Sequence, residues 1–368
     1  MVSPPPAKKQ KTEAEAEVDW TSLPAEVWLA ILRLVTTSTL ASVARTCRSL
    51  RGLCEDPSLW TRLSLDWQTI KKRTASCEQL VSRCPKLARL TITNRTFERV
   101  KHSLVASLVL RAQGSLTHLV ISQETAMTSE AVGSLGKLSS LTSLELAGDW
   151  ITGPATVKLA KLTNLTQLKI PGSGKLVAKD FKDLFSQLTK LTVVDVSECK
   201  KGVTNSSVTA LATNNPNLEY LAIDECEMVT GHGVKVVAEK CPKLRHLSAD
   251  GCYQVNDVAT LKLASSCPDL RYLSLGLCST VKDTTLNKLG PGCPHLEFLN
   301  LFGCAYVSEK GIERLVMTAP ALKHLDMRGI LGVGQAFSLK LEKEYPNINI
   351  VHQFQPKPPR ERKRRSRN

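Results

Sequence analysis

Cysteine is the residue type whose number and spacing first suggest chemistry in this chain. The sequence has 368 residues and 12 cysteines, and seven of the cysteines fall into two series with a period of 26 residues. The first series precedes proline, and the second follows a leucine-rich stretch: Cys241, Cys267 and Cys293, then Cys226, Cys252, Cys278 and Cys304. Regularly spaced thiols can hold zinc, form disulfides or pack as small apolar groups.

The spacing favours packing over metal binding or cross-linking. The closest pairs, Cys47 with Cys54 and Cys77 with Cys84, have six residues between their members, whereas structural zinc sites use tighter spacing. The polar N-terminal segment does not resemble a signal peptide, so we expect reduced thiols in the cytosol or nucleus. No long apolar run predicts a membrane span. The sequence therefore predicts no metal site and no cofactor, and without a phosphate loop or nucleophile motif it predicts no catalytic activity.

Repeats of the pattern L-x-x-L-x-L are the elements that must position the cysteines. Ten copies follow one another between Leu87 and Met327, a partial copy opens at Leu63 and Leu65, and residues 346–351 look like a closing half-copy. A fixed period of about 20 to 29 residues around this core is typical of leucine-rich repeats. We therefore expect the cysteines to recur because the repeats do.

Each copy predicts a short strand followed by a helix. Alternating leucines give a strand with one buried face, and the later apolar positions, three apart, give a helix that proline ends. Stacked copies bury a continuous core, which predicts an α/β leucine-rich-repeat solenoid, or horseshoe, with a parallel sheet on its inner side. Residues 141–190 hold shorter units with Asp149 and Ser173 at the cysteine position. The sequence leaves the curvature of residues 92–190 open.

Residues 23–60 have the pattern of a small all-α domain. Val27, Ile31 and Leu34 share one face of an expected helix. A second expected helix carries apolar residues at steps of three and four: Leu40, Val43, Cys47 and Leu50. Asp56 with Pro57 predicts another helix start. Because so small a domain is marginally stable alone, we expect it to pack on a partner.

This stretch resembles the F-box. The family opens with Leu-Pro-x-Glu, continues with an Ile-Leu pair and a leucine–cysteine segment, and closes with Asp-Pro-x-Leu-Trp. The corresponding residues are Leu23, Pro24, Glu26, Ile31, Leu32, Leu40, Cys47, Asp56, Pro57, Leu59 and Trp60. Leu50 stands where the family more often has tryptophan. The repeats with cysteine, most regular over residues 191–319, are similar to the cysteine-containing leucine-rich repeats typical of F-box proteins.

The resemblance implies a substrate receptor of an SCF-type cullin–RING ubiquitin ligase. In that family the F-box docks on a Skp-type linker subunit, which joins the cullin and the RING protein. The repeats hold the protein substrate for ubiquitination, and catalysis takes place on other chains. We expect this chain to be monomeric within the complex. The residues expected to contact the Skp-type subunit are Leu23, Pro24, Glu26, Ile31, Leu32, Leu40, Val43, Cys47, Leu50 and Trp60.

The residues between the leucines point to the concave face and are the candidates for substrate binding. An aromatic ring or an imidazole recurs there every 26 residues in five successive copies, and charged residues run beside it. Such a row suits the grip of a polypeptide, although rings could also simply cover the sheet. The candidate substrate-binding residues are Tyr220, Arg245, His246, Arg271, Tyr272, Phe298 and His324. A third column holds Ala222, Ser248, Ser274, Asn300 and Asp326.

Basic charge gathers at the two ends of the chain. The net charge is +15, and residues 357–368 hold seven Lys or Arg against one Glu. The two clusters predict nuclear import, with the nucleus as the first expected compartment and the cytoplasm as the second: Lys8, Lys9 and Lys11, with Arg362, Lys363, Arg364 and Arg365. A solvated tail is the plain alternative. A functional alternative is a nucleic-acid or chromatin-associated scaffold that uses the basic tail.

The sequence thus divides into four segments. We expect a disordered N-terminal segment over residues 1–18, an F-box over 19–65, the solenoid over 66–352 and a disordered basic tail over 353–368. The identity of the substrate is not readable from these patterns.

Overall fold

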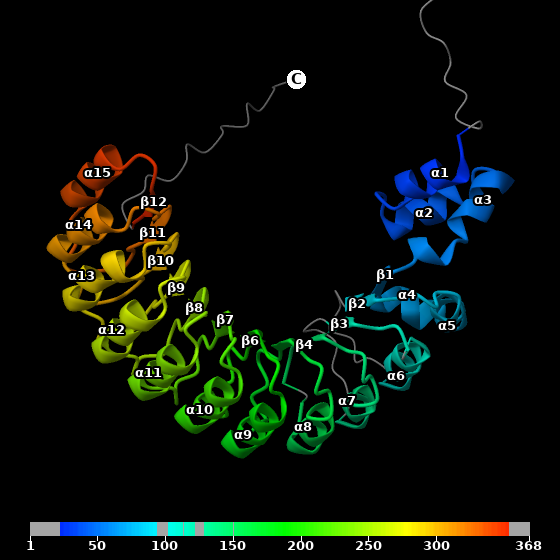
Figure 1. Cartoon of the computed structure of the whole chain (residues 1–368), viewed down its shortest axis with the longest axis horizontal. Coiled ribbons are helices and arrows are strands. Elements are labelled where there is room, and N and C mark those ends of the chain that lie inside the picture. Colours follow the sequence, from blue (N-terminus) through cyan, green and yellow to red (C-terminus); the bar gives the residue numbers. More distant parts are fainter. Residues whose placement is uncertain (1–22, 94–101, 113, 122–128, 150, 353–368) are drawn as a thin grey trace, which may run out of the picture. The chain divides into compact units, whose positions relative to one another are not determined.

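The chain divides into two compact units between residues 62 and 63 (Figure 1). The computed structural model describes residues 23–93, 102–112, 114–121, 129–149 and 151–352. Both basic clusters and most of the segment 94–103 lie outside these residues. Residues 62–66, which the sequence-based boundary assigned mainly to the F-box, form the first strand of the repeat sheet.

The first unit is helical and has a small apolar core. Its helices are α1 (Ala25–Leu32), α2 (Thr37–Val43), α3 (Arg48–Cys54) and the 3₁₀ helix η2 (Pro57–Leu59). The core consists of Leu32, Leu40, Cys54 and Leu59. The Asp56 side chain accepts a hydrogen bond from the Ser58 backbone at 2.7 Å, and Pro57 fills the first helical position. The predicted helix start at this dipeptide is therefore confirmed.

The expectation of one helix through Leu40, Val43, Cys47 and Leu50 is wrong. The chain forms α2 and α3 instead, because Cys47 is extended, with φ −148° and ψ 168°. The Thr46 hydroxyl donates to the Val43 carbonyl at 2.7 Å, and the Cys47 sulfur accepts from the Leu50 N–H at 3.5 Å. Short polar side chains compete in this way for backbone groups that a continuous helix would use.

The second unit is built on a parallel sheet in which each strand lies beside the next in sequence. In the described part of the chain twelve strands follow the order β1 to β12. Figure 1 shows them along the inner side of this unit, with its helices on the outer side. The strands are β1 (Arg62–Asp66), β2 (Arg89–Thr93), β3 (His118–Ile121), β4 (Ser143–Leu146), β5 (Gln167–Lys169), β6 (Val193–Asp195), β7 (Tyr220–Ala222), β8 (His246–Ser248), β9 (Tyr272–Ser274), β10 (Phe298–Asn300), β11 (His324–Asp326) and β12 (Asn349–Val351).

Helices complete the repeats on the other side. They are α4 (Trp67–Lys72), α5 (Thr74–Ser82), α6 (His102–Arg111), α7 (Ser129–Leu135), α8 (Gly153–Leu159), α9 (Ala178–Gln187), α10 (Asn205–Asn214), α11 (Gly231–Lys240), α12 (Asp257–Ser266), α13 (Asp283–Gly292), α14 (Glu309–Thr318) and α15 (Gln335–Glu344). The central leucines pair in register across the sheet, as Leu247 does with Leu221 and Leu273, and all three are fully buried. The predicted solenoid, with its opening and closing part-copies on β1 and β12, is confirmed.

A left-handed residue turns the chain after most strands. Gly251, Gly303 and Gly329 have φ between 67° and 72°, a conformation that glycine adopts at no steric cost. Glu225 and Leu277 hold equivalent positions with φ of 54° and 61°. The turn recurs because each repeat must bend inward at the same point.

The cysteines pack in this turn and at the helix ends. The Cys252 thiol donates to the Ile223 carbonyl of the preceding repeat at 3.1 Å, and the Cys304 thiol donates to the Leu275 carbonyl at 3.2 Å. Cys241 ends α11 and is fully buried. Burial raises the pKa of the Cys252 thiol to about 12. These contacts confirm the predicted packing role, since a thiol is small enough for the layer and can donate a weak hydrogen bond.

Candidate functional site

Five rings form a continuous stack along strands β7 to β11, which we call the ring ladder: Tyr220, His246, Tyr272, Phe298 and His324. Neighbouring ring centroids are 4.0, 3.8, 4.2 and 4.5 Å apart, and the angles between ring planes are 13°, 11°, 6° and 2°. The parallel register sets this stack, because it places each ring directly beside the equivalent ring of the next strand. All five rings are half-buried.

The stack changes how the rings could contact a ligand. Because each ring covers the face of its neighbour, the interior rings present edges rather than faces to the concave side. Ring edges carry partial positive charge and favour oxygen atoms such as peptide carbonyls. The Tyr220 ring is at the end of the ladder, and the Lys169 ammonium lies 5.9 Å from its centroid. The ladder is therefore a rigid ridge suited to a polypeptide backbone.

The ladder carries no charge at neutral pH at the positions where a pKa shift is clear. Burial lowers the pKa of His246 to about 4. Burial also raises the pKa of Tyr220 to about 12, with smaller contributions from Asp195 and Asp224. The pKa of Tyr272 is raised by burial as well. His246 is thus neutral and both tyrosines are protonated near pH 7.

The charged column beside the ladder is paired within itself. Arg245 contacts Glu219 at 3.3 Å, while Arg271 and Lys323 contact Glu297 at 2.9 and 2.6 Å. These side chains are largely exposed, so each pair contributes little stability. Arg245 and Arg271, which the sequence assigned to substrate binding, therefore already have acidic partners on the protein.

Most of the third predicted column is hidden from solvent. Ala222, Ser248, Ser274 and Asp326 are buried and Asn300 is half-buried, and the polar groups of the column are hydrogen-bonded. The Ser248 hydroxyl donates to Asp224 at 2.6 Å, and the Ser274 hydroxyl donates to Asp250 at 2.6 Å. Sequence reasoning did not single out these two aspartates, although each follows its strand by two residues and they are 26 residues apart.

The earlier repeats use the same concave positions differently. At the first position after the leading leucine they place threonine, and the Thr142, Thr166 and Thr192 hydroxyls each donate to a backbone carbonyl of the preceding repeat. At the ladder position they place Ser143, Gln167 and Val193. No ring stack extends into these repeats among the residues that the structure describes.

The predicted Skp-binding residues divide into exposed and buried groups. Pro24, Glu26, Ile31 and Cys47 are exposed, Leu23, Val43, Leu50 and Trp60 are half-buried, and Leu32 and Leu40 are 2% and 1% exposed. The last two belong to the helical core. The Trp60 indole donates to the Cys54 carbonyl at 2.6 Å.

An exposed apolar strip on and just beyond α1 includes Ile31 from the predicted set. Val27, Ile31 and Leu34 are 41%, 38% and 87% exposed. Their spacing of four and three residues puts them on one side of a helix. The sequence showed that Val27 and Leu34 share a face with Ile31 but did not include them among the binding residues.

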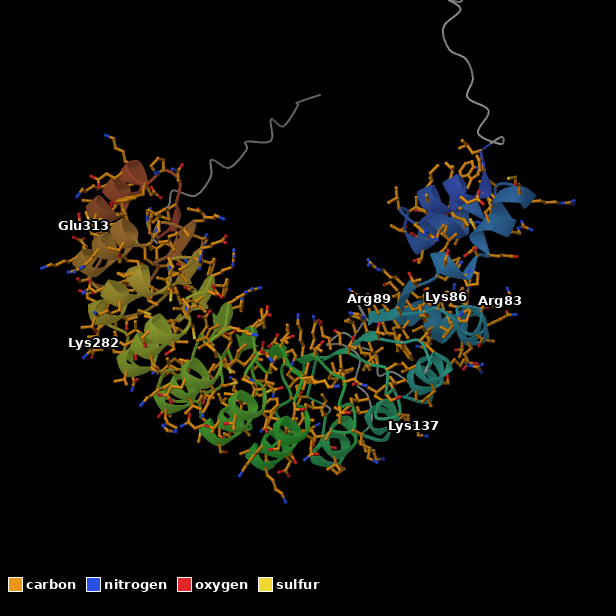
Figure 2. The ribbon with its side chains drawn as sticks, in the orientation of Figure 1. Arg83, Lys86, Arg89, Lys137, Lys282 and Glu313 are labelled. Atoms are coloured by element: carbon orange, nitrogen blue, oxygen red, sulfur yellow. The ribbon has the colours of Figure 1, made fainter. Side chains whose placement is uncertain are left out.

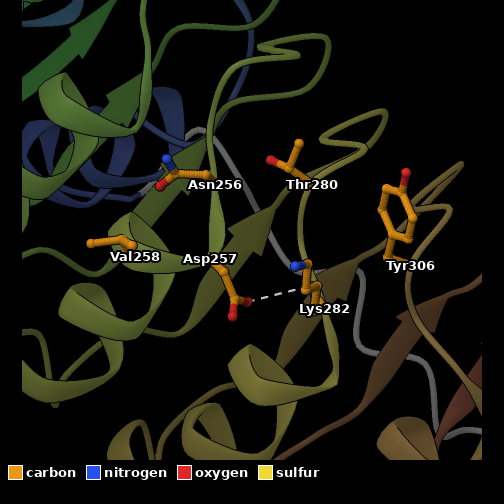
Figure 3. A pocket seen from close by; sticks show the side chains of 6 residues that line it. All are labelled: Asn256, Asp257, Val258, Thr280, Lys282 and Tyr306. Atoms are coloured by element: carbon orange, nitrogen blue, oxygen red, sulfur yellow. Dashed lines mark hydrogen bonds between the residues drawn. The ribbon is translucent and has the colours of Figure 1, made fainter.

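A hollow of about 450 Å³ lies at the N-terminal ends of α12 and α13 (Figure 3). It is lined by Asn256, Asp257, Val258, Thr280, Lys282 and Tyr306. Asp257 accepts hydrogen bonds from the Lys282 N–H at 3.3 Å and from the Thr284 and Thr285 hydroxyls. Its carboxylate thus ties two repeats together. None of the sequence-predicted site residues lines this hollow.

No cluster of three or more metal-ligating side chains occurs within the described ranges. In the same ranges no helix has the length and apolar content to cross a membrane.

Comparison with known proteins shows which family the first unit is similar to. Residues 20–66 match a family model described as F-box-like. The F-box protein SKIP19 of Arabidopsis thaliana is 39% identical over 64 residues, which are 17% of this chain and 20% of that protein. The match thus spans about a fifth of the length of this curated relative.

Three solved structures have a likeness to the chain. A chain of the Rad7–Elc1 complex of yeast is 16% identical, with a TM-score of 0.47, over 89% of this chain and 92% of that chain. An internalin of Listeria monocytogenes is 15% identical, with a TM-score of 0.43, over 90% and 94%. A chain of the TLR13–ssRNA13 complex is 19% identical, with a TM-score of 0.41, over 79% and 42%.

The chain therefore joins an F-box-like segment to a leucine-rich-repeat solenoid. The solenoid follows from the sheet of twelve strands in the part of the chain that the structure describes.

Proposed function

We propose that this chain is the substrate-recognition subunit of an SCF-type cullin–RING ubiquitin ligase. The observation that carries the proposal is the F-box-like match at residues 20–66, followed directly by a repeat sheet with an ordered ring ladder. The first unit docks a Skp-type linker subunit, and the second holds a protein substrate. The chain performs no chemistry of its own in this role.

The docking surface proposed for the Skp-type subunit consists of the half-buried Leu23 and the exposed Pro24 and Ile31. Val27 and Leu34 extend it on the same side as Ile31. Exposed apolar side chains at helical spacing can bury against a partner helix. Leu32 and Leu40 act indirectly, by holding the helices of the unit together.

The ring ladder is the surface proposed for the substrate. Stacked rings lose little side-chain entropy on binding, because they are ordered before a ligand arrives. Their edges offer contacts to peptide oxygen atoms, and the concave sheet gives them a shared orientation. Holding the substrate near the ubiquitin-carrying enzyme of the complex raises the effective concentration of the substrate at that enzyme.

The test of this role is co-purification with a recombinant Skp-type subunit. The double change Leu23→Ala and Pro24→Ala should abolish binding, while circular dichroism and the melting temperature of the solenoid stay unchanged. Leu331→Ala is the matched control, since Leu331 is 90% exposed and lies in the repeats. Normal binding by the double variant would contradict the proposed docking surface.

We also propose that the chain resides in the nucleus. The proposal is supported by the two basic clusters in the sequence, which resemble nuclear import signals. Neutralising both clusters should move a fluorescent fusion into the cytoplasm, and neutralising one should move it less. A double variant that stays fully nuclear would show that the clusters are not the import signal.

A further inference from the structure

The side of the ring ladder at which the strands end is acidic. Six carboxylates stand at the end of β6 and in the turns after β6, β7 and β8, against Lys200 and Lys201. They are Asp195, Glu198, Asp224, Glu225, Glu227 and Asp250. Of the two lysines, Lys200 contacts Glu225 at 3.3 Å. This surface is thus negative on a chain whose net charge is +15.

Three of these carboxylates are close enough to the ladder to act on its rings. Asp195 and Asp224 raise the pKa of Tyr220, and Asp250 and Asp224 raise that of Tyr272, in both cases after the larger effect of burial. Asp195 also pairs in register with Ala222, two residues beyond Tyr220, and Asp224 and Asp250 follow the ends of β7 and β8 by two residues. The ladder and the aspartates therefore form one surface, in which rings uncharged at Tyr220, His246 and Tyr272 run beside negative groups.

These aspartates are held by neutral donors rather than by cations. Asp224 accepts from the Ser248 hydroxyl at 2.6 Å and from the Asp250 N–H at 2.8 Å. Asp195 accepts from the Ser197 N–H at 3.1 Å. In the described part of the chain neither makes an ion pair. The hydrogen bonds fix the carboxylates in place without neutralising their charge, and the nearest cation on the adjoining strand is Lys169, the register partner of Asp195.

The raised pKa of Asp224 agrees with a carboxyl group that has no cationic partner. Burial raises the pKa of its carboxyl above the usual range, and Asp250 and Asp195 raise it further, against the hydrogen bonds from Ser248 and Asp250. A cation placed beside this carboxylate would favour its ionised form.

The shape of the surface selects among cationic ligands. A ridge of ring edges along five strands suits an extended chain rather than a compact ion. Lysine and arginine can lay their apolar stems on the ring edges and extend their charged ends to the aspartates. Because Arg245 and Arg271 are already paired on the other side of the ladder, they do not oppose such a ligand strongly.

We propose that the ring ladder and the strand-end aspartates bind an extended, lysine- and arginine-rich segment of the protein substrate. This inference rests on the proposed function, since it names the chemical class of ligand for the same surface. The complementarity has two parts: apolar stems against the ladder, and positive charges against Asp195, Asp224 and Asp250.

The chain's own C-terminal segment has the same chemistry. The 17 residues from 352 to 368 can span up to about 56 Å, whereas β8 is four strands from β12, or about 19 Å. The segment could therefore reach the surface and compete with a substrate there. Competition by this segment is one outcome of the test below and would itself require the acidic surface.

The test is the binding of a labelled synthetic peptide to the purified full-length chain without any Skp-type subunit. The probe is a fluorescein-labelled peptide of about twelve residues that contains only lysine, arginine, glycine and serine. A second peptide replaces every basic residue by glutamate. The variant Asp195→Asn/Asp224→Asn keeps an acceptor oxygen at each position. The matched control is Glu239→Gln/Glu313→Gln on the outer helices α11 and α14, where Figure 2 shows Glu313.

The basic peptide should bind the intact chain, and the aspartate variant should bind it about tenfold more weakly, while the control variant binds normally. Affinity should fall with added salt, a readout that needs no variant. Neutralising the basic residues of 357–368 in the full chain should leave affinity unchanged or raise it. Equal binding by the aspartate variant, or equal binding of the glutamate peptide, would overturn the inference. These results do not depend on the F-box, whose docking is tested separately.

Discussion

The early and late repeats of the solenoid share one framework and differ at the positions that face outward from the sheet. Just before strands β3 to β6 the chain places threonines whose hydroxyls donate to carbonyls of preceding repeats, so these polar groups serve the fold. At the next position strands β4 to β6 have Ser143, Gln167 and Val193, whereas strands β7 to β11 have stacked rings, with aspartates held close by. The leucine core is equally buried in both regions. Stability is therefore distributed along the solenoid, whereas the proposed recognition is confined to one part of it.

The largest expected effect tests the shared framework. Leu273→Ala in the late region and Leu168→Ala in the early region should each lower the free energy of unfolding by about 2 to 5 kcal/mol, because both side chains are fully buried and leave a cavity. Urea denaturation of both variants measures this. A large loss in only one region would show that the two regions do not share one framework.

The next effect should be confined to the late region. His246 has a folded pKa of about 4 and an unfolded value near 6.5. Below about pH 6.5 the unfolded chain therefore binds more protons, and stability falls until pH reaches about 4. We expect a loss on the order of 1 kcal/mol after allowing for partial exposure. Comparing urea unfolding of the intact chain and of His246→Gln between pH 7 and pH 4 isolates this contribution. An identical pH dependence of the two would contradict the burial of the imidazole within the stack.

An effect of similar size is expected at the turn positions. Cys252→Ser should cost about 1 kcal/mol, because a hydroxyl replaces a thiol in a fully buried layer. Ser173 holds the same position in an early repeat, and its hydroxyl donates to the Ile170 carbonyl at 2.9 Å. Ser173→Cys should cost a similar amount, since it breaks that contact. Thermal melting, with and without a chelator, measures both. A large fall in melting temperature on chelation would mean that the cysteines hold a metal.

The smallest effect concerns the left-handed turn. Leu277 has φ of 61° where Gly303 and Gly329 stand in the following repeats. Leu277→Gly relieves about 1 to 2 kcal/mol of backbone strain and loses about 0.4 to 1 kcal/mol through the freer unfolded chain. A net gain of between zero and about 1.6 kcal/mol is expected. Gly172→Ala, at φ 69°, should be destabilising. If Leu277→Gly is destabilising, the side chain of Leu277 contributes more than its backbone costs.

The fold could be predicted from the sequence because its signals are local and repeated. Leu244, Leu270 and Leu296 recur with the period typical of leucine-rich repeats, and this recurrence fixes the register of the strands. The break between α2 and α3 could not be predicted, since Leu40, Val43, Cys47 and Leu50 keep a helical spacing across it. The helix is interrupted there because the Thr46 hydroxyl donates to the Val43 carbonyl, a backbone group that a continuous helix would use.

The site was only partly predictable for a different reason. The recurrence of rings marked the ladder, but the sequence did not show that the rings cover one another's faces. Nor did it show that Arg245 forms an ion pair with Glu219, or that Ser248 is buried and donates a hydrogen bond to Asp224. These relations depend on distances between repeats, which a periodic pattern does not supply. Asp224 and Asp250 could have been found by asking which polar residues share the period of the rings.

The central claim is that one chain joins a Skp-type subunit at its F-box to a substrate at its ring ladder. The most direct test compares the proteins that co-purify from cells with the intact chain, with Leu23→Ala/Pro24→Ala and with Tyr220→Ala/Tyr272→Ala/Phe298→Ala. The first variant should lose the Skp-type subunit and retain substrates, which accumulate because they are not ubiquitinated. The ladder variant should retain the Skp-type subunit and lose substrates. If the ladder variant captures the same proteins as the intact chain, recognition does not take place on the ladder, and the account is contradicted.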